Sequence, residues 1–257
     1  MIPQFESGCR LQMDKQKFKN ACDTVTDTVR ELKGIGTLGE KMLHCVIKHY
    51  IEPDISWHEV KIGSYYADIV TEDGIFEIQT RSFNSLRKKL AFFLEFSPVT
   101  IVYPLPKTKW LLWIDKDTGE VTKKRKSPKQ GRIYDAFYEL YKIKPQIIDE
   151  NFRFHIIFID VEEYRYLDGW SDDKKRGSSR CERIPIDIAS EERFEKAADY
   201  KKFVPDELPN QFTTKDYKSI AKVNLRTAQT AMNILHHLGV VKRVGKEKKL
   251  HLYERCL

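Results

Sequence analysis

The stretch that most constrains the fold is YYADIVTEDGIFEIQTR, residues 65–81, in which two apolar segments flank a short acidic turn. Segments of this length, rich in β-branched and aromatic residues and separated by a glycine-containing turn, predict a β-hairpin. Asp68 lies in the first segment, and Glu77 and Gln79 lie two residues apart in the second. Alternate residues of a strand share a face, so Glu77 and Gln79 should point the same way. Pairing through the TEDG turn would also bring Asp68 close to Glu77.

The segments around this hairpin alternate between helical and strand patterns. Apolar residues recur every three or four positions in the segments expected to be helices and every two positions in those expected to be strands. Helices are expected over residues 11–33, 37–53, 82–96 and 132–143, and further strands over 58–63, 98–105, 109–115 and 152–167. Residues 168–185 are polar and are expected to form a loop. The mixture predicts an α/β domain over residues 1–204, with a mixed central sheet flanked by helices.

Residues 201–211, KKFVPDELPNQ, carry two prolines and little apolar periodicity, so they are expected to be a linker. Beyond them, Thr214 is expected to cap a short helix and Asn224 a second one. Leu225, Ala228, Met232 and Leu235 form the expected inner face of that second helix. A basic hairpin follows.

The order of helix, turn, helix and β-wing over residues 210–255 resembles the winged helix-turn-helix family. The resemblance implies a separate DNA-binding domain at residues 205–257, whose second helix enters the major groove. The residues it assigns to DNA are Arg226, Thr227, Gln229, Thr230 and Asn233 on the helix, and Lys242, Arg243, Lys246, Lys248 and Lys249 on the wing. Ten lysines and arginines against five acidic residues in 205–257 favour DNA, although many such modules bind only proteins.

Two neighbouring carboxylates repel each other, so Asp68 and Glu77 need a cation or a shared proton between them. Oxygen ligands of this kind suit Mg²⁺ or Mn²⁺. A third carboxylate, Glu40, shares an apolar helical stripe with Leu43 and Ile47. Glu40 could instead close a capping box with Thr37. Likewise, Glu77 and Gln79 could simply belong to the solvated face of a half-exposed strand.

The sequence GTLGE places a Glu at the start of an expected helix, and the hairpin that follows contains ADIV in one strand and FEIQT in the other. This order resembles the PD-(D/E)xK nuclease superfamily, in particular Holliday junction resolvases and restriction endonucleases. The resemblance covers residues 35–105. It implies a restriction-endonuclease-like fold and metal-dependent hydrolysis of phosphodiester bonds in DNA. Asp68, Glu77 and the carbonyl oxygen of Ile78 would bind the metal, and Glu40 would join through water or a second metal.

The departure from the family pattern is Gln79, which stands where a lysine is usual and supplies no positive charge. The nearby cations that could replace that lysine are Lys61 on the first strand, Arg81 on the same face as Gln79, and Arg87 or Lys88 on the next helix. The alternative is a catalytically inactive DNA-binding regulator on a nuclease-like fold. A third reading is a protein-interaction module with a basic surface.

The net charge of +7 suits a polyanionic partner, and we expect duplex DNA. A homodimer would supply the two sites that cutting both strands usually needs. The basic segment at residues 122–132 could touch phosphates or be a solvated loop. Five scattered cysteines without a CxxC pair, and no long apolar run, predict a cytoplasmic protein without a membrane segment.

Overall fold

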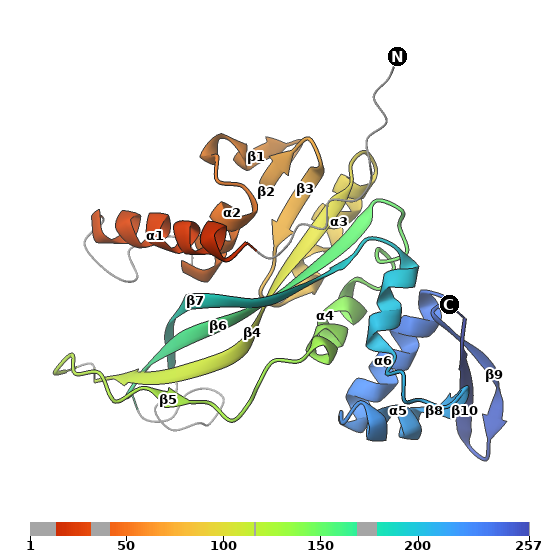
Figure 1. Cartoon of the computed structure of the whole chain (residues 1–257). Helices are drawn as coiled ribbons and strands as arrows, with labels where there is room; N and C mark the ends of the chain where they lie inside the picture. Colours follow the sequence, from red (N-terminus) through yellow and green to blue (C-terminus); the bar gives the residue numbers. More distant parts are fainter. Residues whose placement is uncertain (1–13, 32–41, 116, 169–178, 257) are drawn as a thin grey trace.

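The computed structural model describes residues 14–31, 42–115, 117–168 and 179–256 (Figure 1). Its centre is a seven-stranded mixed sheet in the order β1-β2-β3-β4-β6-β7, with β5 paired to β4. The strands are β1 His58–Ile62, β2 Tyr65–Thr71, β3 Gly74–Ile78, β4 Val99–Ile114, β5 Arg125–Lys126, β6 Phe152–Tyr166 and β7 Ser179–Phe194.

Strands β1, β2 and β3 form an antiparallel meander, whereas β3, β4 and β6 are parallel and β7 returns antiparallel to β6. The parallel step from β3 to β4 needs a crossover, which α3 supplies. The helices beside this sheet are α1 Lys15–Glu31, α2 Met42–Ile51, α3 Arg87–Leu94 and α4 Phe137–Leu140. Short 3₁₀ turns occupy Ile55–Trp57, Phe83–Leu86, Ile133–Ala136, Tyr141–Ile143 and Ala197–Phe203.

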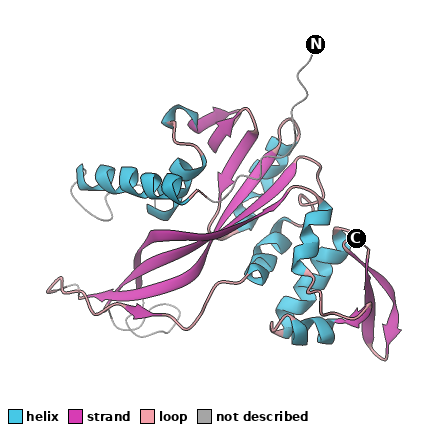
Figure 2. Ribbon diagram, viewed as in Figure 1, coloured by secondary structure: helices cyan, strands magenta, loops and turns pink. Residues whose placement is uncertain are grey.

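Two hydrophobic clusters hold these layers together. Helices α1 and α2 pack on one side of the sheet, where Phe18 and Ile47 meet Ile69 and Ile157. Helices α3 and α4 pack on the other side, as Figure 2 shows. No helix in the ranges described above is both long and apolar enough to cross a membrane.

The small C-terminal unit contains β8 Gln211–Thr213, α5 Thr214–Ile220, α6 Leu225–His237, β9 Val241–Glu247 and β10 Leu250–Arg255. Its antiparallel sheet has the order β8-β10-β9. Asn224 caps α6 as expected, since its side chain accepts from the Thr227 N–H. The cap of α5, however, is Thr213 and not Thr214, because the Thr213 hydroxyl accepts from the Lys215 and Asp216 N–H groups.

The structure confirms the mixed sheet with flanking helices and corrects several element assignments. The segments 98–105 and 109–115 form one strand, β4. The expected loop at 168–185 is wrong from Ser179 onward, where the chain enters β7. Three register shifts against β6 interrupt the two-residue period of β7. Pro185 is tolerated there because β7 is an edge strand.

The expected linker is also wrong, because Phe203, Val204 and Leu208 are buried. They belong to one hydrophobic cluster that runs from the sheet and α4 into α5 and α6. The buried Tyr217 hydroxyl of α5 donates to the Phe203 carbonyl at 2.8 Å. The proposed domain boundary at residue 204 stays a prediction, but the chain on either side of it packs into a common core.

Candidate functional site

The β2–β3 hairpin positions the two candidate carboxylates. Ile69 pairs with Phe76, Val70 with Ile75 and Thr71 with Gly74, so Asp68 and Glu77 come next in register. Gly74 fixes this register because its φ of +120° favours glycine and an added Cβ would lie 2.4 Å from the Pro98 carbonyl oxygen. The hairpin therefore cannot shift along the start of β4 without a clash.

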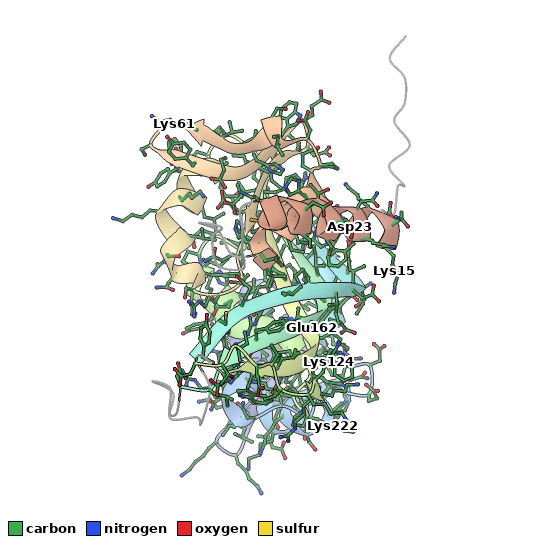
Figure 3. The ribbon with its side chains drawn as sticks, turned by 90° about the vertical axis from the view of Figure 1, so that its left-hand side faces the viewer. Lys15, Asp23, Lys61, Lys124, Glu162 and Lys222 are labelled. Atoms are coloured by element: carbon green, nitrogen blue, oxygen red, sulfur yellow. The ribbon has the colours of Figure 1, made fainter. Side chains whose placement is uncertain are left out.

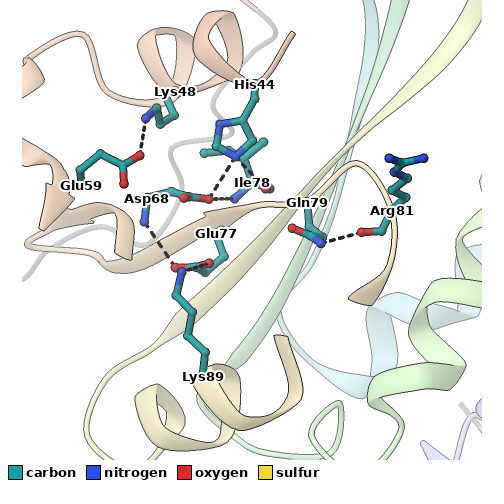
Figure 4. A network of polar contacts seen from close by, with 9 residues as sticks. All are labelled: His44, Lys48, Glu59, Asp68, Glu77, Ile78, Gln79, Arg81 and Lys89. Atoms are coloured by element: carbon teal, nitrogen blue, oxygen red, sulfur yellow. Dashed lines mark hydrogen bonds and ion pairs between the residues drawn. The ribbon is translucent and has the colours of Figure 1, made fainter. Parts of the chain in front are cut away.

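Side chains replace the backbone ladder where the pairing of β2 and β3 ends. The Ile78 N–H donates to Asp68 Oδ2 at 2.7 Å, and the Asp68 N–H donates to Glu77 Oε1 at 3.3 Å (Figure 4). Each carboxylate thus accepts from the opposite strand. The predicted proximity of Asp68 and Glu77 is present, and it arises from these reciprocal side-chain contacts.

Lys89, from α3, supplies a positive charge to this pair. Its Nζ lies 2.6 Å from Glu77 Oε2, and Glu77 is 3% exposed. Burial and the Asp68 charge raise the Glu77 pKa from 4.5 to about 7, while Lys89 lowers it. At neutral pH, Lys89 therefore favours the ionised form of Glu77, the form that can bind a cation.

His44, from α2, approaches the same pair from the other side (Figure 4). Its Nε2 lies 3.0 Å from the Ile78 carbonyl oxygen and 3.3 Å from Asp68 Oδ2. The resemblance assigns both of these residues, Asp68 and Ile78, to the metal together with Glu77. An imidazole N–H donor thus contacts two of the expected ligand oxygens.

The other candidates for the site lie apart from these carboxylates. Gln79 follows the end of β3, and its amide donates to the Arg81 carbonyl at 2.5 Å (Figure 4). Lys61 is exposed on β1, the edge strand, and pairs with Tyr66 (Figure 3). Glu40 falls outside the described residues.

Sequence reasoning missed Lys89 and His44. Lys89 lies three residues after Leu86 and four before Phe93, both of which are buried. That spacing places Lys89 on the core-facing side of α3, whereas the candidates named from sequence, Arg87 and Lys88, are exposed. A lysine on an apolar helical stripe was the available signal.

The oxygen ligands suit a hard cation, although there are few of them. Among the residues that the structure describes, no group of three or more His, Cys, Asp or Glu is placed to hold a metal. Mg²⁺ can be held by one or two carboxylates because it keeps several waters. Asp68, Glu77 and the Ile78 carbonyl oxygen therefore fit such an ion if the His44 imidazole moves aside.

The C-terminal residues assigned to DNA divide into exposed and buried groups. Arg226 and Gln229 are exposed on α6, Thr230 and Asn233 are partly exposed, and Lys242, Arg243, Lys246, Lys248 and Lys249 are all exposed on the β9–β10 hairpin. Thr227 is not outward-facing as expected: it is 5% exposed, and its hydroxyl bonds to Tyr138 OH at 2.7 Å. Leu225, expected on the inner face, is 47% exposed. The other predicted inner-face residues, Ala228, Met232 and Leu235, are buried as expected, so packing against Tyr138 changes the buried face only at the start of α6.

The basic segment at residues 122–132 is partly fastened to the rest of the molecule. Lys124 Nζ lies 2.6 Å from Glu162 Oε1 (Figure 3). The Arg132 guanidinium donates to the Lys222 carbonyl at 2.7 Å and to that of Ala221. Arg132 thus ties this segment to the end of α5, while Lys129 between them is exposed.

The chain belongs to the family described as "Domain of unknown function (DUF8091)", which matches residues 41–195. This range contains all seven strands of the large sheet and the Asp68–Glu77 pair. The chain is also similar to an uncharacterized protein of Treponema pallidum (strain Nichols), with 27% identity over 229 residues, covering 86% of this chain and 87% of that protein. No solved structure matches the chain.

Proposed function

We propose that this protein is a metal-dependent endonuclease that hydrolyses phosphodiester bonds in duplex DNA. The observation that carries the proposal is the trio of Asp68, Glu77 and Lys89, which joins two carboxylates to a cation at the end of a hairpin. The order α2, β1, β2, β3, α3 and β4 supports a PD-(D/E)xK-like fold, since it repeats the helix, three strands and helix of that resemblance. The C-terminal order of two helices and a β-hairpin supports a winged helix.

In this proposal, Asp68, Glu77 and the Ile78 carbonyl oxygen hold Mg²⁺ or Mn²⁺. The bound ion would lower the pKa of a water and offset charge on the scissile phosphate. Lys89 favours the ionised form of the buried Glu77 and supplies the positive charge that Gln79 lacks. Gln79 is left to orient the turn through its bond to the Arg81 carbonyl.

The test is cleavage of a labelled DNA duplex in Mg²⁺ and in Mn²⁺. We expect Asp68→Asn, Glu77→Gln and Lys89→Met each to abolish cleavage while leaving duplex binding in EDTA nearly unchanged. Lys88→Met is the matched control, because Lys88 is the adjacent, exposed lysine of α3. Wild-type cleavage rates in both carboxylate variants would refute the assignment.

A second candidate, DNA binding without cleavage, is favoured by the position of His44. Its imidazole contacts Ile78 O and Asp68 Oδ2, so a metal would have to displace it. Mn²⁺ titration by calorimetry separates the two candidates. Binding that Asp68→Asn removes supports the nuclease, whereas no Mn²⁺ binding by either wild type or His44→Ala supports the regulator.

A further inference from the structure

A buried carboxylate outside the candidate active site gathers a cluster of guanidinium groups. Glu163, in β6, is 0% exposed. Its Oε1 accepts from Arg165 Nε at 2.8 Å and its Oε2 from Arg183 Nε at 2.8 Å, while Arg180 Nε lies 3.9 Å from Oε2. One negative charge therefore faces three positive ones, and the cluster keeps a net positive charge.

Glu163 stays ionised in this setting. Burial alone would raise its pKa, but Arg183 and Arg165 lower the pKa to about 2. Arg165 binds the carboxylate through both Nε and a terminal nitrogen, whereas Arg183 binds it through Nε. Glu163 thus orients the guanidinium groups of its neighbours without neutralising them as a set.

Two of these arginines, Arg180 and Arg183, line a cavity of about 420 Å³ together with further cations. Its basic lining residues are Arg81, Lys109, Lys129, Arg180 and Arg183. The acidic residues of the same wall, Asp135 and Glu139, are engaged elsewhere. Asp135 accepts from the Arg132 N–H, and Glu139 accepts from the Phe83 N–H and pairs with Lys142.

This cavity lies between the candidate active site and α6. At one end it adjoins a second cavity of about 180 Å³, since Thr80, Arg81, Arg180 and Arg183 line both, and His44 lines the second. At the other end its wall includes Tyr138, whose ring lies 5.7 Å from the Arg226 guanidinium carbon. A basic groove therefore runs from His44, beside Asp68, to the start of α6.

We propose that this groove, lined by Arg81, Lys109, Lys129, Arg180 and Arg183, binds the phosphate backbone of duplex DNA between the carboxylate site and α6. The inference rests on the proposed function for the identity of the polyanion. The arrangement suits a backbone because guanidinium groups bind phosphate in a fixed, bidentate geometry and need no base contact. It differs from the winged-helix contacts, which use other residues.

The test is the salt dependence of binding to a fluorescent DNA duplex in EDTA, so that no cleavage is required. The groove variant is Arg81→Gln with Lys129→Gln, because both side chains are exposed and their removal leaves Glu163 with its partners. Each lost phosphate contact should lower the slope of log K against log salt by about 0.9. The double variant should therefore lose about 2 from the slope, which is about 60-fold in affinity at 0.1 M salt if affinity at 1 M is unchanged.

The matched control is Lys19→Gln with Lys201→Gln, which removes the same charge from exposed positions outside the groove. A reduced slope in the groove variant alone supports the proposal. Equal slopes in the groove and control variants, or no duplex binding by the wild type, overturn it. The proposed function is judged separately by cleavage: a groove that binds DNA without cleavage refutes only the nuclease, and cleavage with an unchanged slope refutes only the groove.

Discussion

Replacing Glu77 by glutamine removes a carboxylate whose ionisation opposes folding. Glu77 is 3% exposed and lies beside Asp68, and these two features raise its pKa from 4.5 to about 7 despite the Lys89 ammonium. Glutamine keeps the size and shape of the side chain but has no group that ionises. The substitution therefore isolates the energetic cost of placing this charge in the folded protein.

The sign follows from comparing the folded and unfolded chains. Below pH 4.5 both hold the proton, so the contribution of Glu77 to stability is fully present. Between pH 4.5 and about 7 the unfolded chain releases the proton and the folded chain does not, so stability falls by about 1.4 kcal/mol per pH unit. The loss totals about 3 kcal/mol and is complete above the folded pKa. The free energy of unfolding of Glu77→Gln, measured relative to the wild type, should thus increase by about 3 kcal/mol between pH 4.5 and pH 8.

The assay is urea unfolding of both proteins in EDTA at several pH values across that range. Glu72→Gln is the control, because Glu72 lies in the same hairpin but is exposed. The stability difference between Glu72→Gln and wild type should stay nearly constant with pH. A Glu77→Gln difference equally independent of pH would refute the burial and the Asp68 proximity on which the site depends.

The same experiment reports on metal binding. A cation held by Asp68 and Glu77 would offset the repulsion between them, so Mn²⁺ should stabilise the wild type most where both are ionised. At 100 times its dissociation constant, a ligand stabilises the folded state by about 2.7 kcal/mol. We expect that gain at pH 8 in the wild type and its absence in Glu77→Gln. An equal gain in both proteins would place the metal elsewhere.

Three further predictions test the surroundings of the site. Lys89→Met should shift the stability loss caused by Glu77 to higher pH, because the pKa of that carboxyl rises further without the ammonium; urea unfolding should give no such shift for Lys88→Met. The stability contribution of Glu163 depends on pH in the opposite direction to that of Glu77. Its pKa falls from 4.5 to about 2, so its contribution of about 3 kcal/mol is present above pH 4.5 and is lost as pH falls toward 2. Glu163→Gln should remove that acid sensitivity, as measured by unfolding between pH 2 and 6, and an unchanged acid profile would contradict the ion pairs. Gly74→Ala should destabilise by more than about 1 kcal/mol, because the methyl group meets the Pro98 carbonyl oxygen; a neutral effect in thermal unfolding would argue against the hairpin register.

The hairpin and its carboxylates could be predicted from sequence because they depend on short-range information. The turn and the two-residue period fix which residues of β2 oppose β3, and so bring Asp68 close to Glu77. The cation could not be chosen in this way. The apolar stripe of α3 sets Lys89 apart from the exposed Arg87 and Lys88, but Lys89 reaches Glu77 only because α3 packs against the sheet.

Errors elsewhere have a similar physical origin. The strand β7 was hidden because its register shifts remove the alternation that marks a strand. The buried face of α6 was misjudged at Leu225 and Thr227 because a partner from outside the C-terminal unit, Tyr138, decides which side is covered. In each case the missing information was a contact with a distant part of the chain.

The common core limits how the two proposed activities can be separated by experiment. Phe93, whose ring centroid lies 5.7 Å from Lys89 Nζ, belongs to the same hydrophobic cluster as Phe212, Tyr217 and other side chains of the C-terminal unit. Deleting residues 205–257 would expose the rest of that cluster to solvent and remove Thr227, the hydrogen-bond partner of the Tyr138 hydroxyl. Loss of cleavage after such a deletion would therefore report on the packing of α3 as much as on DNA binding. Charge-removing substitutions at exposed positions of α6 and the β9–β10 hairpin leave the core in place, so their effects can be assigned to the DNA contact itself.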